Sequence, residues 1–561
     1  MNAITINYLN GILINCRFNS IQTTKYCKLL LTMNFFIRTN IGTNIGIGHL
    51  VRVSRLADRL HKLGHKCWFF VDHLPKNNFE IFRKNKLHPI YSNKKKFSTE
   101  SKDAKIFNLK TSEIGRGFVI VDDYRLSHVW EKIVNKKHLK LLAFDDLEDK
   151  KHYADFILNY NPRHYENNLY NKKNIIKKNC KLLVDPRYNI INPTSKRGSN
   201  YLESKSFEIL FYAGGGGDHR YFYKTISKLL NITKKVKKKI TVKVIIGPLS
   251  KNKNLIFKLS KKNKQITPIV NETNLSKHIA KAKIFIGAAG TAIFETSFYK
   301  IPTILFQMSK NQKNDYSALE KLGHYLILNK EDLRESEKIA KLIITLVEQY
   351  KRFKNLVKNR SIHLDNKGVN RIAKVILGKN KAKIDNKKNL KKSNFKNKIL
   401  LKKALDEEIN HYLQSRNLPL NRQQSTHNKK ISSIDHYIWW FKNRRNSFVL
   451  TKNQKKILYI YDEKIYGMKD TDYFLSGWFA CSKECTGKEI MFALNWQRKL
   501  YKKSIKKIIW LGFVKSNNVF GNYITKYFFG KRISNKNNFM SKILKRNFNV
   551  NTDYSFYYRK G

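Results

Sequence analysis

Phe35 to Arg52, FFIRTNIGTNIGIGHLVR, predicts a short buried strand, a glycine-rich turn and the first turn of an amphipathic helix. The helix continues with Val51, Leu56, Leu60 and Leu63 as its apolar stripe, and Gly64 is a plausible C-cap. Glycines allow the backbone to approach a ligand closely, and the start of a helix offers free N–H groups to an anion. The stretch therefore predicts a phosphate-binding turn.

His49 stands at the entrance of this predicted helix. The positive end of a helix disfavours imidazolium, so a histidine there tends to stay neutral and able to accept a proton. Our working hypothesis is a general base beside a phosphate cradle. The alternative is a loop histidine that only hydrogen-bonds backbone, because short glycine motifs are weak evidence.

The composition limits the classes of protein to consider. A chain of 561 residues predicts about three domains. No apolar run approaches the ~20 residues of a membrane span, so we expect no membrane insertion. The formal charge of +71 comes from lysine spread along the whole chain together with abundant Asn, Ile, Phe and Tyr. This bias is typical of an A+T-rich genome, and we expect no specific nucleic-acid partner.

Six cysteines are too few and too scattered for a disulfide framework, which favours a reducing cytoplasm. Residues 1–32 lack the features of a secretory signal, and the first strand follows directly after Met33. We therefore expect Met33 to be the natural start and residues 1–32 to be an N-terminal extension; a short disordered leader is the alternative.

Further short apolar runs alternate with helical stretches, which predicts βαβ units and parallel sheets. The strands predicted before the second glycine-rich region are 66–71, 117–121, 139–144 and 156–158. Acidic pairs follow two of them, at Asp122-Asp123 and Asp145-Asp146. At the carboxyl ends of the strands such residues could bind substrate hydroxyls, tune His49 or cap helices.

A second unit of the same kind follows an asparagine-rich bridge. Its strand 207–212 leads into four consecutive glycines and Asp218, and its strand 283–286 leads into Gly287-Ala288-Ala289-Gly290-Thr291 and a helix. These turns predict a second anion cradle. Glu295, one turn into the helix, could take the paired hydroxyls of a ribose, or it could be a carboxylate favoured by the helix dipole. Two such halves predict a GT-B-like pair of Rossmann-like domains with a nucleotide-sugar cleft between them.

These motifs resemble one family, the UDP-2,4-diacetamido-2,4,6-trideoxy-β-L-altropyranose hydrolases of pseudaminic acid biosynthesis, which have a MurG-like GT-B fold. The resemblance covers about residues 33–350. Its motifs are Arg38 with residues 45–52, residues 121–124, 144–147, 155–159, 215–218 and 287–295, and Asn311-Gln312. The family usually has Asp where Asn40 stands and His where Asp123 stands, so the sugar itself stays open.

The resemblance implies catalytic roles for His49 as the base, Tyr124 and Asn311. The substrate-binding residues expected from the motifs and the resemblance are Gly46, Gly48, Arg52, Asp145, Gly215, Gly216, Asp218, Gly290, Thr291, Glu295 and Gln312. Water would attack the anomeric carbon and displace UDP, whose charge the cradles stabilise. No acidic cluster for a metal is apparent in the sequence, so we expect no metal requirement and no cofactor for this reaction.

The remaining sequence predicts a basic linker at 379–430, with one amphipathic stretch at 399–414, and a smaller α/β domain at 431–561. The latter faintly resembles GNAT acetyltransferases through residues 436–441, 514–518 and Gly530. An active domain would use acetyl-CoA, but only Gly487 stands where the family's pyrophosphate turn is glycine-rich, so an inactive remnant is the alternative. The predicted Rossmann-like domains are 33–200 and 201–378.

Three functions remain open at this point. The first is a cytoplasmic UDP-sugar hydrolase that releases a free 6-deoxy diacetamido sugar for a nonulosonic acid. The second is a GT-B glycosyltransferase that uses a UDP-amino sugar on another acceptor. The third is a non-enzymatic basic scaffold that binds glycans or nucleic acid.

Overall fold

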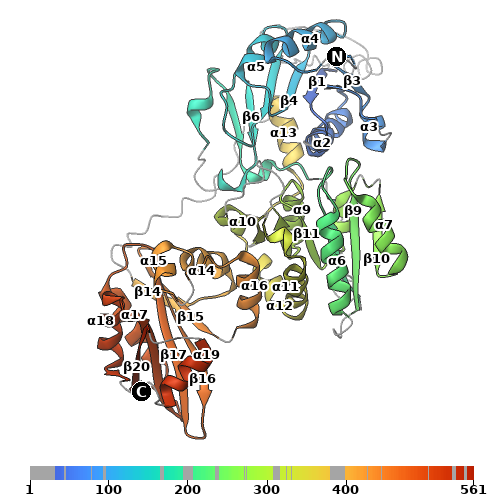
Figure 1. The fold of residues 1–561 in the computed structure, drawn as a ribbon. Coiled ribbons are helices and arrows are strands. Elements are labelled where there is room, and N and C mark those ends of the chain that lie inside the picture. The colour runs from blue at the N-terminus through green and yellow to red at the C-terminus, as the bar shows by residue number, and fades with distance from the viewer. Residues whose placement is uncertain are drawn as a thin grey trace, which may run out of the picture.

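The computed structural model describes residues 32–42, 46–76, 79–92, 96–164, 170–191, 193, 206–233, 239–270, 272, 274–306, 316–323, 325–329, 331–378, 399–425, 428–443, 445–502, 504–533, 539–548 and 553–560. Three sheets organise them, one per region of the chain (Figure 1). The predicted extension at 1–32 lies outside the described residues except for Thr32, whose hydroxyl donates to the carbonyl of Gly64.

The first lobe is a seven-stranded parallel sheet in the order β3-β2-β1-β4-β5-β6-β7. Its elements are β1 (Asn34–Thr39), α2 (Gly48–Lys62), β2 (Lys66–Val71), α3 (Glu80–Lys84), β3 (Leu87–Pro89), α4 (Glu100–Ser112), β4 (Phe118–Asp122), α5 (His128–Asn135), β5 (Lys140–Phe144), β6 (Phe156–Asn159) and β7 (Lys181–Val184). The switch in strand order falls between β1 and β4, where Thr39 pairs with Asp122. In such sheets ligands bind beside this switch point.

The second lobe repeats the plan with six parallel strands in the order β10-β9-β8-β11-β12-β13. Its elements are β8 (Ser206–Tyr212), α6 (Arg220–Thr233), β9 (Lys239–Ile246), α7 (Lys253–Lys262), β10 (Ile266–Val270), α8 (Leu275–Ile279), β11 (Ile284–Ala288), α9 (Ala292–Tyr299), β12 (Thr303–Phe306), α10 (Tyr316–Gly323), β13 (Leu326–Leu328), α11 (Ser336–Glu348), α12 (Tyr350–Lys358) and α13 (Gly368–Ile376). Two Rossmann-like lobes of this kind form the predicted GT-B-like arrangement.

Helix α13 crosses back to the first lobe, although it follows the second lobe in sequence (Figure 1). Its buried residues Ile372, Ala373 and Ile376 share a core with Phe35 and Leu56 of the first lobe. Gly368 lies against the Asn189 carbonyl so closely that an added Cβ would be 2.0 Å from that oxygen. The first lobe therefore needs residues that we predicted to belong wholly to the second.

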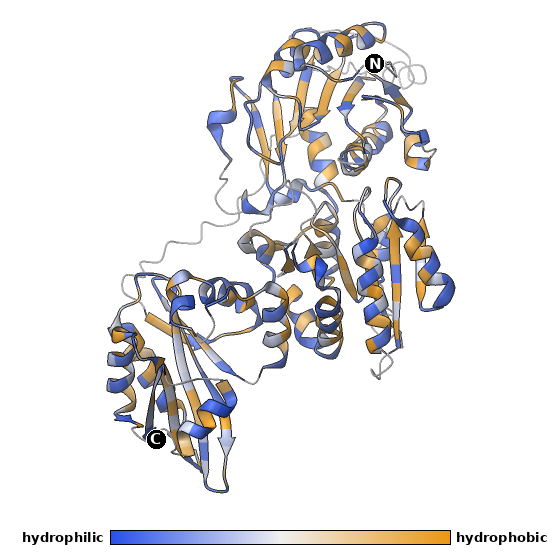
Figure 2. Ribbon diagram, viewed as in Figure 1, coloured by the Kyte–Doolittle hydropathy of each residue, from blue (hydrophilic) through white to orange (hydrophobic). Residues whose placement is uncertain are grey.

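The third sheet is mixed, in the order β14-β15-β16-β17-β18-β20-β19. This region comprises β14 (Ile399–Lys403), α14 (Ile409–Arg416), α15 (Pro419–Gln423), α16 (Ser433–Lys442), β15 (Asn446–Lys452), β16 (Lys455–Gly467), β17 (Thr471–Ala480), α17 (Gly487–Leu500), β18 (Lys507–Lys515), α18 (Val519–Phe529), β19 (Lys531–Arg532), α19 (Phe539–Phe548) and β20 (Tyr554–Lys560). All three regions are α/β, and in the two Rossmann-like lobes the strands are largely orange while the helices carry both orange and blue faces (Figure 2).

The structure corrects the predicted linker at 379–430. Residues 399–403 pair with β15 as an edge strand, and α14 buries Ile409 and Tyr412 in the core that also contains α11 of the second lobe. Helix α16 bridges the same two regions, because the Tyr437 hydroxyl donates to the Asn410 side chain at 2.7 Å and accepts from the Ile327 backbone at 3.1 Å. The amphipathic stretch predicted at 399–414 covers β14 and most of α14, but its lysine-rich surroundings led us to assign it to a linker.

No helix in the described part of the chain is long and apolar enough to cross a membrane.

Candidate active site

His49 is held by a buried carboxylate from the neighbouring strand end. Its Nδ1 lies 2.6 Å from Asp122 Oδ1, and Asp122 is completely buried at the end of β4. The pairing assigns the proton to Nδ1, which leaves Nε2 with a lone pair. Among the residues that the structure describes, Nε2 has no hydrogen-bond partner, so this nitrogen is available to accept a proton from a bound molecule.

Arg52 fixes the same carboxylate from the next turn of α2. Its Nε and Nη2 each donate to Asp122 at 2.6 Å, and its Nη1 donates to Asp146 at 2.8 Å. Burial alone would raise the pKa of Asp122, but Arg52 and His49 outweigh it and hold that pKa well below its usual range. Asp122 is therefore an anion at neutral pH and favours the Nδ1–H tautomer of His49.

Tyr124 completes the wall around the imidazole. Its ring stands edge-on to that of His49, with centroids 4.5 Å apart, and its hydroxyl donates to Asp146 at 2.6 Å. Burial and the charge of Asp146 raise the pKa of Tyr124 well above its usual range, so the hydroxyl keeps its proton. Tyr124 can orient a substrate but does not act as a base.

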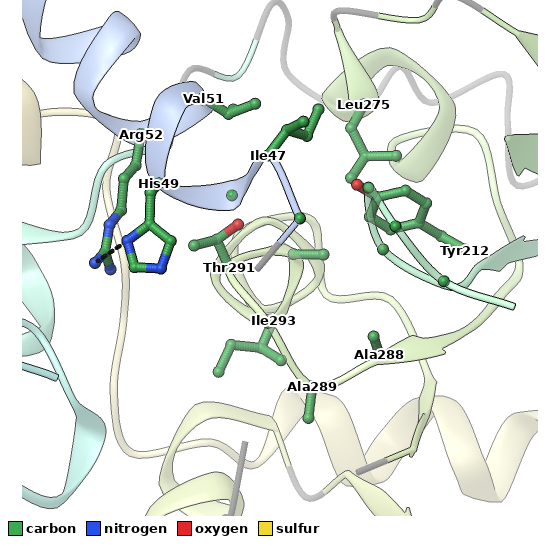
Figure 3. Close-up of a pocket in the computed structure, with 18 of the residues that line it drawn as sticks. Ile47, His49, Val51, Arg52, Tyr212, Leu275, Ala288, Ala289, Thr291 and Ile293 are labelled. Carbon is green, nitrogen blue, oxygen red and sulfur yellow. Dashed lines mark hydrogen bonds between the residues drawn. The ribbon is translucent and has the colours of Figure 1, made fainter. Parts of the chain in front are cut away.

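The imidazole opens into a cavity of about 610 Å³ between the two lobes. In Figure 3 His49 and Arg52 project from α2 on one side, opposite Thr291, the N-cap of α9, and Ile293 of that helix. The predicted residues that line this cavity are Gly46, Gly48, His49, Arg52, Tyr124, Gly215, Gly216, Asp218, Gly290, Thr291 and Glu295. The structure thus brings the predicted base and both predicted cradles together.

The glycine turns of the two lobes meet at this cavity. A Cβ on Gly215 would lie 2.5 Å from Ile47 Cγ1, and a Cβ on Gly46 would lie 3.9 Å from the Gly216 backbone nitrogen. Gly46 also has a φ of +79°, a conformation that side chains disfavour. Glycine at these places is required by the close approach of the lobes as well as by ligand access.

Glu295 is buried in the second-lobe wall of the cavity with a relative exposure of 2%. Its Oε1 lies 2.7 Å from Arg55 Nη2 across the cleft, but this contact lacks hydrogen-bond geometry. Neither carboxylate oxygen has a hydrogen-bond partner in the described part of the chain. A buried carboxylate with unused acceptors is suited to a ligand that carries O–H donors.

Three predicted residues are placed differently or lie outside the described residues. Asp145 does not line the cavity, because its carboxylate turns to the Tyr170 hydroxyl at 2.7 Å and to His152 Nε2 at 3.5 Å. The neighbouring Asp146 faces the cavity instead. Asn311 and Gln312 lie outside the described residues, so their predicted roles stay predictions.

Asp218 lines the cavity, but its carboxylate already accepts hydrogen bonds from neighbouring residues of the second lobe. Its carboxylate accepts from Arg220 Nε at 2.8 Å and from the Asn252 side chain at 2.9 Å at the start of α6. Asp122 and Asp146 belong to the acidic pairs that we expected to tune His49, bind substrate hydroxyls or cap helices, and Asp122 does pair with His49. Our predicted site residues named neither of them, nor Tyr160 or Arg55. Of these, Asp122 and Asp146 carried a signal as polar residues after buried strands, whereas nothing local marked Tyr160 or Arg55.

Within the described residues, no group of three or more His, Cys, Asp or Glu side chains could hold a metal ion. Metal independence stays a prediction.

The turn before α17, where the GNAT resemblance implies the acetyl-CoA pyrophosphate, fits that group poorly. The Glu489 side chain accepts from the Thr486 backbone at 3.1 Å and caps the helix start. Lys452 pairs with the same carboxylate at 2.7 Å. An anionic ligand would have to compete with the Glu489 carboxylate for the Thr486 N–H, and we derive no acetyl-transfer step. Acetyl-CoA binding stays a prediction.

Comparison with known proteins finds similarity in parts of the chain. Residues 209–376 match the glycosyltransferase family 28 C-terminal domain. An uncharacterised protein of Methanocaldococcus jannaschii is 22% identical over 504 residues, which span 85% of this chain and 93% of that protein. A UDP-2,4-diacetamido-2,4,6-trideoxy-β-L-altropyranose hydrolase of Campylobacter jejuni is 23% identical over 299 residues, 52% of this chain and 98% of that protein.

Among solved structures, MurG of Acinetobacter baumannii is similar over 62% of this chain and 99% of its own, with 13% identity and a TM-score of 0.42. A UDP-N-acetylglucosamine 2-epimerase is similar over 64% of this chain and 99% of its own, with 12% identity and a TM-score of 0.42.

Proposed function

We propose that this protein acts on a UDP-linked sugar and hydrolyses it at the anomeric carbon, with a 2,4-diacetamido-2,4,6-trideoxy sugar as the substrate. The observation that carries the proposal is the His49–Asp122 pair, which opens into the same interlobe cavity as Glu295 and the glycine turns. A relative that the chain matches over 98% of its length is named as a hydrolase of such a sugar. In this role the protein would supply free sugar for nonulosonic, specifically pseudaminic, acid synthesis.

The proposed reaction uses His49 as a general base. Its Nε2 takes a proton from water as the water oxygen bonds to the anomeric carbon. The bond between that carbon and the phosphate oxygen breaks, and UDP leaves with the electron pair. Asp122 stabilises the resulting imidazolium through Nδ1–H, as carboxylates do in comparable pairs.

The second lobe would bind the UDP portion. Neither oxygen of the Glu295 carboxylate accepts a hydrogen bond from a described residue, although Oε1 lies in an ion pair with Arg55, so both can accept the two hydroxyls of a ribose. The turns at Gly215 and Gly290 lie on the same wall and would approach the diphosphate with backbone N–H groups. Preorganised donors at a departing phosphate stabilise its developing charge without a proton donor.

The direct test incubates purified protein with a panel of UDP-diacetamido sugars and follows UDP release in the absence of any acceptor. Hydrolysis in H₂¹⁸O should place no label in UDP, because water attacks carbon and not phosphorus. UDP release that requires an added sugar or lipid acceptor would instead identify a glycosyltransferase. Interconversion of the sugar without net UDP release would identify an epimerase. Salt-sensitive polyanion binding without UDP affinity would identify a scaffold.

A further inference from the structure

Arg55 lies on the face of α2 that also presents His49 and Arg52, at successive intervals of three residues. The two arginines have different surroundings. Arg52 is fully engaged by first-lobe groups, whereas the carboxylate beside Arg55 belongs to Glu295 of the opposite lobe. Arg55 also donates from Nη1 to the Ile190 carbonyl at 3.0 Å, which anchors one side of its guanidinium.

The acidic groups near His49 favour a first-lobe cation beside a bound diphosphate, in addition to Lys251 and the glycine turns of the second lobe. Arg52 contacts both Asp122 and Asp146, so this group carries one net negative charge. Arg163, another cation on the cavity wall, is paired with Glu148 at 2.6 Å. The guanidinium of Arg55 lines the cavity and has the fork geometry that suits phosphate oxygens.

The ion pair between Arg55 and Glu295 is incompletely satisfied without a ligand. The carboxylate is 2% exposed, and neither of its oxygens accepts a hydrogen bond from a described residue. A ribose diol would donate two hydrogen bonds to Glu295 and weaken its hold on Arg55. The guanidinium would then lie beside the phosphates attached to that same ribose, where it can exchange one anion for another.

We propose that Arg55 is the first lobe's diphosphate-binding residue, and that a nucleoside diphosphate replaces the Arg55–Glu295 ion pair with one contact to each partner. This inference rests on the proposed binding of UDP. It assigns Arg55 a binding role in which the two lobes hold two ends of one ligand, ribose on Glu295 and phosphate on Arg55.

The test measures Kd for uridine, UMP and UDP by calorimetry with the full-length wild type, Arg55→Gln and Arg55→Lys. In the wild type the second phosphate should improve affinity. In R55Q the ratio of the UMP Kd to the UDP Kd should fall by about tenfold or more, the equivalent of one lost charge-assisted hydrogen bond. Uridine affinity should hold or improve in R55Q, because Glu295 is released. R55K keeps the positive charge, so its ratio of the UMP Kd to the UDP Kd should lie between those of R55Q and the wild type.

Lys84→Gln is the matched control, since Lys84 is an exposed cation of the same lobe that pairs with Asp58 and does not line the cavity. An unchanged Kd ratio in R55Q would overturn the proposal. An equal loss of affinity for uridine and UDP would also overturn it, since that result would show that Arg55 only holds the two lobes together. Absence of UDP binding by the wild type would overturn the proposed function itself, and the thermal melts of R55Q and R55K show whether each variant is folded.

Discussion

Asp122→Asn tests how the buried carboxylate supports His49. The Asp122 side chain accepts three hydrogen bonds, one from His49 Nδ1 and two from Arg52, each at 2.6 Å. Asparagine has nearly the same shape but only one acceptor oxygen, and its NH₂ group would face an N–H donor of His49 or Arg52. The substitution therefore removes the charge and leaves the volume of the site almost unchanged.

The expected effect follows from these contacts. A hydrogen bond to a charged group contributes ~1.5–3 kcal/mol, which corresponds to a loss of ~10- to 150-fold in kcat if the bond acts in the transition state. If the amide turns its N–H toward Nδ1, the imidazole proton moves to Nε2 and the base is lost. The loss then approaches the ~10²–10⁴-fold typical of general-base catalysis. Arg52 retains Asp146 and Tyr160 as partners, so we expect the variant to fold.

The assay compares kcat for UDP release with the Kd of UDP in the wild type, D122N and Asp155→Asn. Asp155 is the matched control, because it is a carboxylate of the same lobe that pairs with Lys177 at 2.8 Å and does not line the cavity. D122N should lose kcat at nearly constant UDP affinity, and D155N should retain both. A folded D122N protein with kcat within about threefold of wild type would refute the role given to the His49–Asp122 pair.

Three other changes test separate parts of the structure. Gly215→Ala should weaken UDP binding, because its Cβ would be 2.5 Å from Ile47 Cγ1 and overpacking costs ~1–3 kcal/mol. Gly42→Ala is the control, since no atom of a described residue lies within 4 Å of its Cβ, and equal UDP affinities in the two variants would contradict the reasoning. Burial alone would lower the pKa of His152, but Asp145 and Glu131 outweigh burial and raise that pKa to about 10. The protonated His152 side chain therefore stabilises the fold fully below about pH 6.5, and this stabilisation is lost as the pH rises to about 10. Urea unfolding should show the wild-type advantage over His152→Gln shrinking across that range by about 1.4 kcal/mol per pH unit, and a constant difference would contradict it. Tyr437→Phe should lower the free energy of unfolding by ~1–2 kcal/mol, because Ile327 N–H and Asn410 lose their partner, and an unchanged thermal melt would show that this contact does not join the regions.

The local parts of this fold could be predicted from sequence because each depends on neighbouring residues. The strand at 66–71 was predicted with the bounds of β2, and the glycine turns were placed correctly before α2 and α9. Apolar runs and glycines carry that information within a few residues. The GT-B-like arrangement followed because two such units occur in order.

The missed features depend on contacts between distant residues. The sequence indicated that an acidic pair could tune His49, but the choice of Asp122 depends on the register of β1 against β4, which brings together two residues that are 73 positions apart. The return of α13 to the first lobe likewise depends on packing of Ile372 and Ile376. Strand β14, ILLKK, lies in a lysine-rich segment, and only its pairing with β15 identifies it as part of the third sheet.

The central claim is that His49 acts in the chemical step and not in binding UDP. The most direct measurement is UDP release and UDP affinity in His49→Ala, made side by side with the wild type. In His49→Ala, release from a UDP-diacetamido sugar should fall by ~10²-fold or more while the Kd for UDP stays within about threefold. Retained release, or a loss of UDP affinity that parallels the loss of activity, would contradict it.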